Sequence, residues 1–166
     1  EKSVVRFHAA EGPVRFRVGR QEFRPLADRV TDTTRCTVLG FEGGNLATVE
    51  HLLAALFIRG IWEGLVIEVA GVEVPILDGS AKEWLEALSP YPGAGPEPVR
   101  LAQLLEVSQA LSSAKATPAA EFSLLTSIAF THPKIGQQQI ACPPLALSEL
   151  APARTFGFLL EVEALR

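Results

Sequence analysis

The sequence has few cysteines, no long apolar run and no concentration of positive charge. Its two cysteines, Cys36 and Cys142, are too few and too far apart for a disulfide scaffold or a closed cysteine zinc site. No apolar run approaches the roughly 20 residues of a membrane-spanning helix. The 15 Lys and Arg residues are scattered and the net charge is −4, so no basic face for nucleic acid is expected. We therefore expect a cytoplasmic protein without an integral membrane segment or a nucleic-acid partner.

Other absences concern motifs and the two ends of the chain. The sequence contains no Gly-rich dinucleotide fingerprint, no P-loop and no G-x-S-x-G elbow. Methionine is absent, the first residue is Glu1, and the last residues, "EVEALR", have the pattern of a helix interior. These features predict that both ends are cut from a longer chain.

The residues that are present predict a mixed α+β fold. Short alternating patterns predict strands within residues 1–40. The stretch "ATVEHLLAALFIRG" then carries a helical stripe of apolar residues, with Thr48 or Asn45 as the expected N-cap and Gly60 as the expected end. After it, "GLVIEVAGVEVPILDGSA" predicts a strand, a turn and a second strand.

The second half of the sequence predicts a further helix, a linker and more strands. Ser80 and Glu83 have capping-box spacing at the start of that helix. "SPYPGAGPEP" (89–98) has four prolines and two glycines, which predicts a stiff linker. "EFSLLTSIAF" and "QQQIAC" predict strands, and "ALSEL" predicts a short helix. We expect a first α+β domain at 1–88, the linker at 89–98 and a partial second α+β domain at 99–166.

Glu50 and His51 are the strongest candidates for chemistry. In the first turn of a helix, unpaired N–H groups make the local potential positive. A carboxylate there stays ionised, as a general base requires, and an imidazole is biased towards the neutral form that binds metal. The alternative is structural: a glutamate at a helix start commonly complements the dipole, and a lone histidine is more often a surface residue than a ligand. Spacing alone leaves both open.

For four other residues, the sequence pattern does not decide between alternative roles. Cys36 is expected to be a small buried hydrophobe because no base lies near it in the sequence. Asp78 is expected to form the turn into the second helix. Thr155 and Phe156, in "ARTFGF", precede a helix-like pattern, where a threonine hydroxyl caps the helix or faces a ligand.

Three motifs together resemble a known family. "TVEHLLAAL", "VEVPILDGSA" and "ARTFGF", in this order, resemble the UDP-3-O-acyl-N-acetylglucosamine deacetylases of lipid A biosynthesis, and "TTRCTVL" and "FTHP" also fit. The resemblance implies a zinc-dependent hydrolase that removes the N-acetyl group from a UDP-acyl-sugar. It implies two similar domains, each a sheet with a pair of helices, the second incomplete here. His51 would be a zinc ligand, Glu50 the general base, Thr155 and Phe156 substrate contacts, and Cys36 a neighbour of the acyl passage.

The sequence departs from that family at both ends. The family's other two zinc ligands, in an H-x-x-x-D helix, and its general-acid histidine would follow Arg166, and an "LHSG" loop would precede Glu1. We therefore expect the chain by itself to be inactive. The alternatives are a shortened, non-catalytic homologue acting as a binding or interaction module, and a plain structural α+β domain. The apolar segment "FSLLTSIAF" of an incomplete domain would favour self-association.

Overall fold

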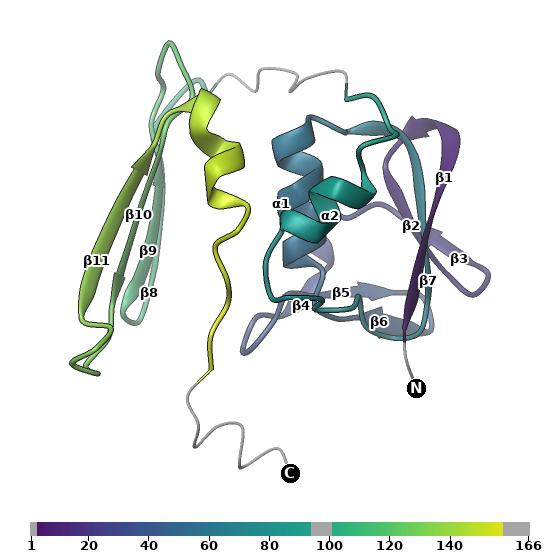
Figure 1. Cartoon of the computed structure of the whole chain (residues 1–166), viewed down its shortest axis with the longest axis horizontal. Helices are drawn as coiled ribbons and strands as arrows, with labels where there is room; N and C mark the ends of the chain where they lie inside the picture. The colour runs from purple at the N-terminus through teal and green to yellow at the C-terminus, as the bar shows by residue number, and fades with distance from the viewer. Residues whose placement is uncertain (1–2, 94–100, 158–166) are drawn as a thin grey trace. The chain divides into compact units, whose positions relative to one another are not determined.

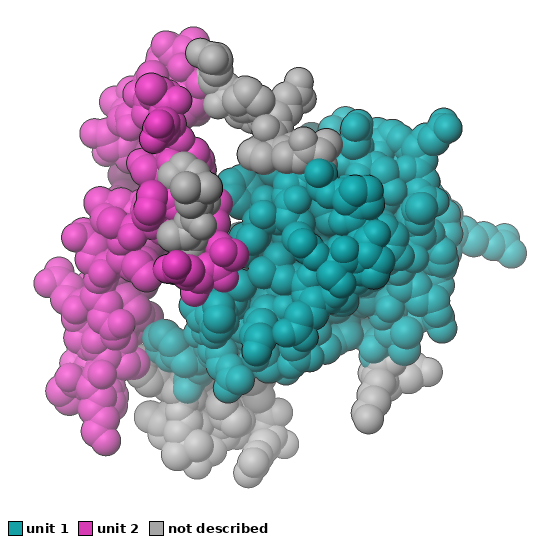
Figure 2. Space-filling view, turned by 45° about the horizontal axis from the view of Figure 1, so that its top comes forward, with its two compact units in different colours: residues 1–96, 151–166 teal, residues 97–150 magenta. Residues whose placement is uncertain are grey.

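The computed structural model describes residues 3–93 and 101–157. The chain divides into two compact units, which Figure 2 colours separately: unit one comprises residues 1–96 and 151–166, and unit two comprises residues 97–150. The described residues combine four small sheets with two α-helices, which confirms the mixed α+β class (Figure 1).

The division into domains at 1–88 and 99–166 with a linker at 89–98 remains a prediction. Residues 94–98 of that linker lie outside the described residues, as do residues 158–166 of the expected second domain.

The centre of unit one is a four-stranded sheet in the order β1–β7–β2–β3 (Figure 1). The strands are β1 (Val4–Pro13), β7 (Glu63–Ala70), β2 (Arg15–Val18) and β3 (Gln21–Phe23). β1 pairs with β7 antiparallel and β2 with β3 antiparallel, while β2 runs parallel to β7. A late strand, β7, therefore lies between two early ones.

The register lines up one apolar row across all four strands. Phe7 lies opposite Ile67, Ile67 opposite Phe16, and Phe16 opposite Phe23. Because side chains alternate between the faces of a strand, these four share one face of the sheet. Ile67 and Phe16 are fully buried, so this face forms the floor of the core.

The opposite face carries a row of alternating charges. Glu68 pairs with Arg6 at 3.2 Å and approaches Arg17 at 3.9 Å, and Arg17 pairs with Glu22 at 2.6 Å. Hydrogen bonds from Arg17 and then Arg15 hold the pKa of Glu22 below its usual value. These contacts satisfy the charges of a solvent-facing sheet surface, which is their ordinary role.

Two helices cover the apolar face. α1 (Glu50–Arg59) buries Leu52 and Leu56, and α2 (Lys82–Ala87) buries Trp84, whose ring meets Phe7 edge-on at 6.4 Å. The helices expected in "ATVEHLLAALFIRG" and after Ser80 are confirmed, and Gly60 ends α1 in the left-handed conformation, as predicted. None of the helices in the described part of the chain has the length and apolar character needed to cross a membrane.

A second, three-stranded sheet completes unit one. β5 (Val38–Phe41) lies between β4 (Val30–Asp32) and β6 (Gly44–Leu46), after the 3₁₀ helix η1 (Ala27–Arg29). Phe41 stacks on Phe23 at 4.9 Å, which joins this sheet to the same core. The prediction of a second strand after β7 is wrong. The chain there makes a single bridge, Ala47 with Glu73, because the partner segment turns at Thr48 and enters α1 at Glu50.

Unit two consists of two hairpins and a 3₁₀ helix. β8 (Leu105–Gln109) pairs with β9 (Ser112–Ala116), β10 (Leu124–Ala129) pairs with β11 (Gln137–Cys142), and η2 spans Pro144–Leu150. The strands at β10 and β11 were predicted, whereas the β8–β9 hairpin was not. Its second strand, "SSAKA", lacks the β-branched and aromatic residues that indicate a strand.

Candidate functional site

Glu50 and His51 lie in the first turn of α1. Hydrogen bonds hold this segment on two sides, from Thr37 to Glu50 and from Thr48 to Glu73. Val49 is the residue before the helix, and no side chain caps the helix N-terminus. The predicted cap is therefore wrong for both candidates. Thr48 donates its hydroxyl hydrogen to Glu73 at 2.6 Å, and Asn45 lies within β6. Because no side chain caps this end, unpaired N–H groups keep the potential beside Glu50 and His51 positive.

The Glu50 carboxylate is held by one oxygen. Its Oε2 accepts the backbone N–H of Thr37 at 2.8 Å, and the Val49 N–H reaches the Thr37 carbonyl at 3.4 Å. Its Oε1 lies 4.0 Å from Nε2 of His51, beyond hydrogen-bond distance. The side chain of Glu50 is 36% exposed and that of His51 is 13% exposed. One carboxylate oxygen is thus anchored, while the other faces an imidazole nitrogen.

Cys36 precedes the residue that anchors Glu50. It is a free, half-buried cysteine in the loop before β5. Its position next to Thr37 places it in the chain segment that contacts the start of α1. The predicted burial of Cys36 is only partial, since the loop leaves part of the residue accessible.

Thr155 lies in the irregular segment after η2 and is bonded to the loop that leads into α2. Its N–H donates to the carbonyl of Gly79 at 2.8 Å, and the Ala81 N–H donates to the carbonyl of Ala151 at 3.0 Å. Thr155 and Phe156 are both exposed. The hydrogen bond of Thr155 joins it to the "DGS" loop, and its side chain caps no helix among the described residues.

Asp78 forms the turn before α2, as the sequence predicted. Its Oδ1 accepts both the hydroxyl and the N–H of Ser80, at 2.7 and 3.0 Å. Its Oδ2 accepts from Arg154 at 3.2 Å. The Ser80 hydroxyl above all holds the pKa of Asp78 below its usual value, against the effect of burial, and Arg154 adds to the lowering. No local pattern signals the Arg154 contact, which joins residues 76 positions apart in the chain.

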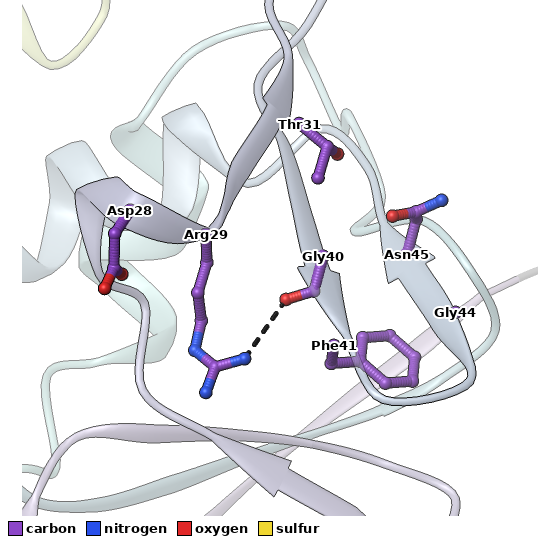
Figure 3. Close-up of a pocket in the computed structure, with 7 residues that line it drawn as sticks. All are labelled: Asp28, Arg29, Thr31, Gly40, Phe41, Gly44 and Asn45. Atoms are coloured by element: carbon purple, nitrogen blue, oxygen red, sulfur yellow. Dashed lines mark hydrogen bonds between the residues drawn. The ribbon is translucent and has the colours of Figure 1, made fainter.

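A shallow hollow of about 410 Å³ lies elsewhere in unit one, over η1 and the β4–β5–β6 sheet (Figure 3). Asp28, Thr31 and Asn45 contribute polar side chains to its wall. The Arg29 guanidinium donates to the Gly40 carbonyl at 3.4 Å and lies over the Phe23 ring, so its charge is already engaged. Neither Glu50 nor His51 lines this hollow.

The described residues do not by themselves form a metal site. A catalytic zinc takes three protein ligands and keeps one position open. The His51 imidazole, with a carboxylate oxygen 4.0 Å from its Nε2, matches one ligand and an adjacent base. Within residues 3–93 and 101–157, however, no three His, Cys, Asp or Glu side chains gather as metal ligands. This part of the chain therefore does not by itself supply the donors of a catalytic metal site.

Comparison with known proteins identifies similar sequences throughout the chain. A family model described as "LpxC: UDP-3-O-acyl N-acetylglycosamine deacetylase" matches residues 3–166. The UDP-3-O-acyl-N-acetylglucosamine deacetylase of Thermosynechococcus vestitus is 41% identical over 84% of this chain and 50% of its own length. Proteins of the same name from Nitratidesulfovibrio vulgaris and Helicobacter pylori are 38% and 35% identical, over 98% and 84% of this chain. The chain spans about half the length of these relatives.

Proposed function

Because this chain belongs to the UDP-3-O-acyl-N-acetylglucosamine deacetylase family, we propose that it forms part of an enzyme that hydrolyses the N-acetyl group of that nucleotide sugar. The observation that carries the proposal is the pair at the start of α1. A carboxylate with one anchored oxygen lies beside a largely buried imidazole at an uncapped helix N-terminus. Such a pair suits hydrolysis of an amide, which needs an activated water and a stabilised oxyanion.

We assign separate roles to the two residues. His51 is one ligand of a zinc ion whose other ligands come from the part of the relatives' length that this chain does not match. When bound, zinc supplies a Lewis acid and a water of lowered pKa. Glu50 is the general base. Its Oε2 is held by Thr37, which leaves Oε1 to take a proton from the attacking water.

The remaining assignments follow the family resemblance. Thr155 and Phe156 contact substrate, and Cys36 lies near the passage for the acyl chain. The exposure of Thr155 and Phe156 and the partial exposure of Cys36 support these roles, since a substrate contact has to be accessible. In the complete enzyme of lipid A synthesis, we propose a second sheet-plus-helix-pair domain built on the hairpins of unit two.

The test uses a full-length chimera, in which this chain replaces the matching segment of the Thermosynechococcus vestitus relative. We expect the chimera to release acetate from UDP-3-O-acyl-N-acetylglucosamine, and Glu50→Gln to lower kcat by about 100-fold or more, the usual range for general-base catalysis. Zinc content should stay near one per chain in Glu50→Gln and fall in His51→Ala. Glu83→Gln, in the first turn of α2, is the matched control and should keep full turnover.

Two results would overturn these assignments. Full turnover by the Glu50→Gln chimera would refute the base, and unchanged zinc content in His51→Ala would refute the ligand. The 166-residue chain alone should show no zinc-stimulated turnover, because its described residues hold no three-ligand group.

A second candidate role is association between copies through unit two. The register of β8–β9 puts Leu105 and Val107 on one face with Ala114 and Ala116, and Val107 is 68% exposed. Exposed apolar faces of this kind favour self-association. We expect the sedimentation coefficient of the chain to rise with concentration, and Val107→Lys to suppress the rise. A concentration-independent coefficient for the parent chain would rule this role out.

A further inference from the structure

Thr48, two residues before Glu50, has a backbone conformation that threonine rarely adopts. Its φ is +59°, in the left-handed region, where a β-branched side chain is strained. It is also 4% exposed, and thus one of the few buried polar residues in the described part of the chain. Strain of this kind persists only where the surroundings over-determine the conformation, and it concentrates at functional sites.

Three hydrogen bonds tie this turn to the segment after β7. The Thr48 hydroxyl donates to Oε1 of Glu73 at 2.6 Å. The Ala47 N–H donates to the carbonyl of Val72, and the Val74 N–H donates to the carbonyl of Ala47, both at 2.9 Å. The two backbone bonds fix the chain as far as Ala47. The side-chain bond extends the attachment by one residue, to the point where the chain turns into α1.

The turn at Thr48 determines where the first helical residues point. Val49 already has helical backbone angles, and α1 begins at Glu50. A change of φ at Thr48 would therefore rotate Glu50 and His51 together relative to Thr37, which anchors the Glu50 carboxylate at 2.8 Å. The helix behind them is held by its buried residues, so the adjustable element is the turn itself.

The presence of threonine at position 48 indicates that its hydroxyl is needed. Glycine would adopt this φ without strain, and valine would fill the same buried space without burying a hydroxyl. Threonine is favoured over both only where its hydroxyl makes a bond. That bond goes to a carboxyl oxygen of Glu73 at 2.6 Å. It also diverts the hydroxyl from the N-capping role that its place in the sequence suggests.

We propose that Thr48 and Glu73 are positioning residues for the Glu50–His51 pair. Their hydrogen bond holds a strained left-handed turn that fixes the direction of both side chains. The inference deepens the proposed hydrolytic function and rests on it for the reaction itself, whereas the structural part of the claim is testable in the chain alone.

The first test measures the NMR signals of the His51 imidazole in the 166-residue chain. The chain has three histidines, so a carbon–proton spectrum of the imidazoles has few signals, and His51→Gln assigns the relevant one. We expect Thr48→Val and Glu73→Ala to shift the His51 signal while the His8 signal and the circular dichroism stay unchanged. Thr48→Ser, which keeps the hydroxyl, should restore the parent signal. Glu83→Ala is the matched control and should shift nothing.

The second test measures turnover in the full-length chimera. We expect Thr48→Val and Glu73→Ala to lower kcat by about 10- to 100-fold, since a misplacement of about 1 Å costs about 100-fold. KM should stay within about threefold, and Thr48→Ser should keep most of the parent kcat. If Thr48→Val does not fold, Thr48→Gly takes its place. It adopts the same φ freely and loses only the side chain, and it should also shift His51 and lower kcat.

The outcomes separate this proposal from the proposed function. Unchanged His51 signals in Thr48→Val and Glu73→Ala would overturn the positioning role. A fall in kcat that only follows the folded fraction would also overturn it. If the parent chimera does not deacetylate the nucleotide sugar, the proposed function fails, and the His51 spectra of the chain still decide whether Thr48 and Glu73 position the pair.

Discussion

Replacing Glu50 should lower the free energy of unfolding, an effect that can be separated from any effect on catalysis. Two effects favour its carboxylate in the folded chain: the N–H of Thr37 donates to it at 2.8 Å, and it stands in the first turn of α1. Glu50→Ala removes both effects. Glu50→Gln keeps an oxygen that accepts the Thr37 hydrogen bond and removes only the charge.

The structure sets the size of the expected change. A hydrogen bond to a charged acceptor contributes about 1.5–3 kcal/mol. The Glu50 side chain is 36% exposed, so solvent competes for it and the lower end of that range applies. A charge in the first turn of a helix adds about 0.3–1 kcal/mol. We therefore expect Glu50→Ala to lower the free energy of unfolding by about 2 kcal/mol and Glu50→Gln to lower it by less than about 1 kcal/mol.

Urea denaturation of the 166-residue chain provides the assay, with the fluorescence of Trp62 and the buried Trp84, both in unit one, as the probe. Glu83→Ala is the matched control. Glu83 stands in the first turn of α2 and accepts no hydrogen bond in the described part of the chain, so it should show only the effect of the helix dipole. Equal losses in Glu50→Ala and Glu83→Ala would refute the contribution of the Thr37 contact.

Further predictions concern the core, the end of α1 and acid stability. Leu52→Ala, in a fully buried position, should lower the free energy of unfolding by about 3 kcal/mol, and Leu111→Ala, at an exposed one, by less than about 0.5 kcal/mol; equal urea midpoints would contradict this. Gly60→Ala should lower it by about 1 kcal/mol, because φ is +66° there; an unchanged melting temperature would count against the strain. Contacts from Ser80 above all hold the pKa of Asp78 below 3.8, so the ionised side chain stabilises the fold above that pH and its contribution disappears as pH falls through the folded value. The melting-temperature advantage over Asp78→Asn should therefore be constant well above pH 3.8 and shrink as pH falls below it, whereas an advantage that does not shrink in acid would refute this.

Elements with one strong local pattern were predictable, and elements made by distant pairing were not. The stripe of α1 and its glycine end are encoded within one short segment, and both were found. The parallel pairing of β2 with β7 depends on residues 51 positions apart, for which a local pattern carries no signal. The strand expected after β7 failed because a short alternating pattern does not provide a partner strand, and Ala47 offered only one bridge.

The candidate site shows the same division. Glu50 and His51 were identified because they are adjacent and stand at a recognisable helix start. Thr37 and Glu73, which hold this turn from the two sides, belong to segments with no functional signature of their own. Thr48 was identified for its hydroxyl, but with a capping role. Whether a hydroxyl caps a helix or bonds elsewhere depends on φ, and no residue pattern specified a left-handed threonine.

The strand order of the central sheet also has a kinetic consequence. β1 and β2 both pair with β7, and β7 follows them only after more than forty further residues, including α1. The loop that has to close before the sheet can form is therefore long, and topologies of this kind fold slowly. The hairpins of unit two close over short loops and should form first. During synthesis, the first 62 residues would leave the ribosome without their central strand, so the helix that carries Glu50 and His51 would wait for β7 before its apolar face is covered.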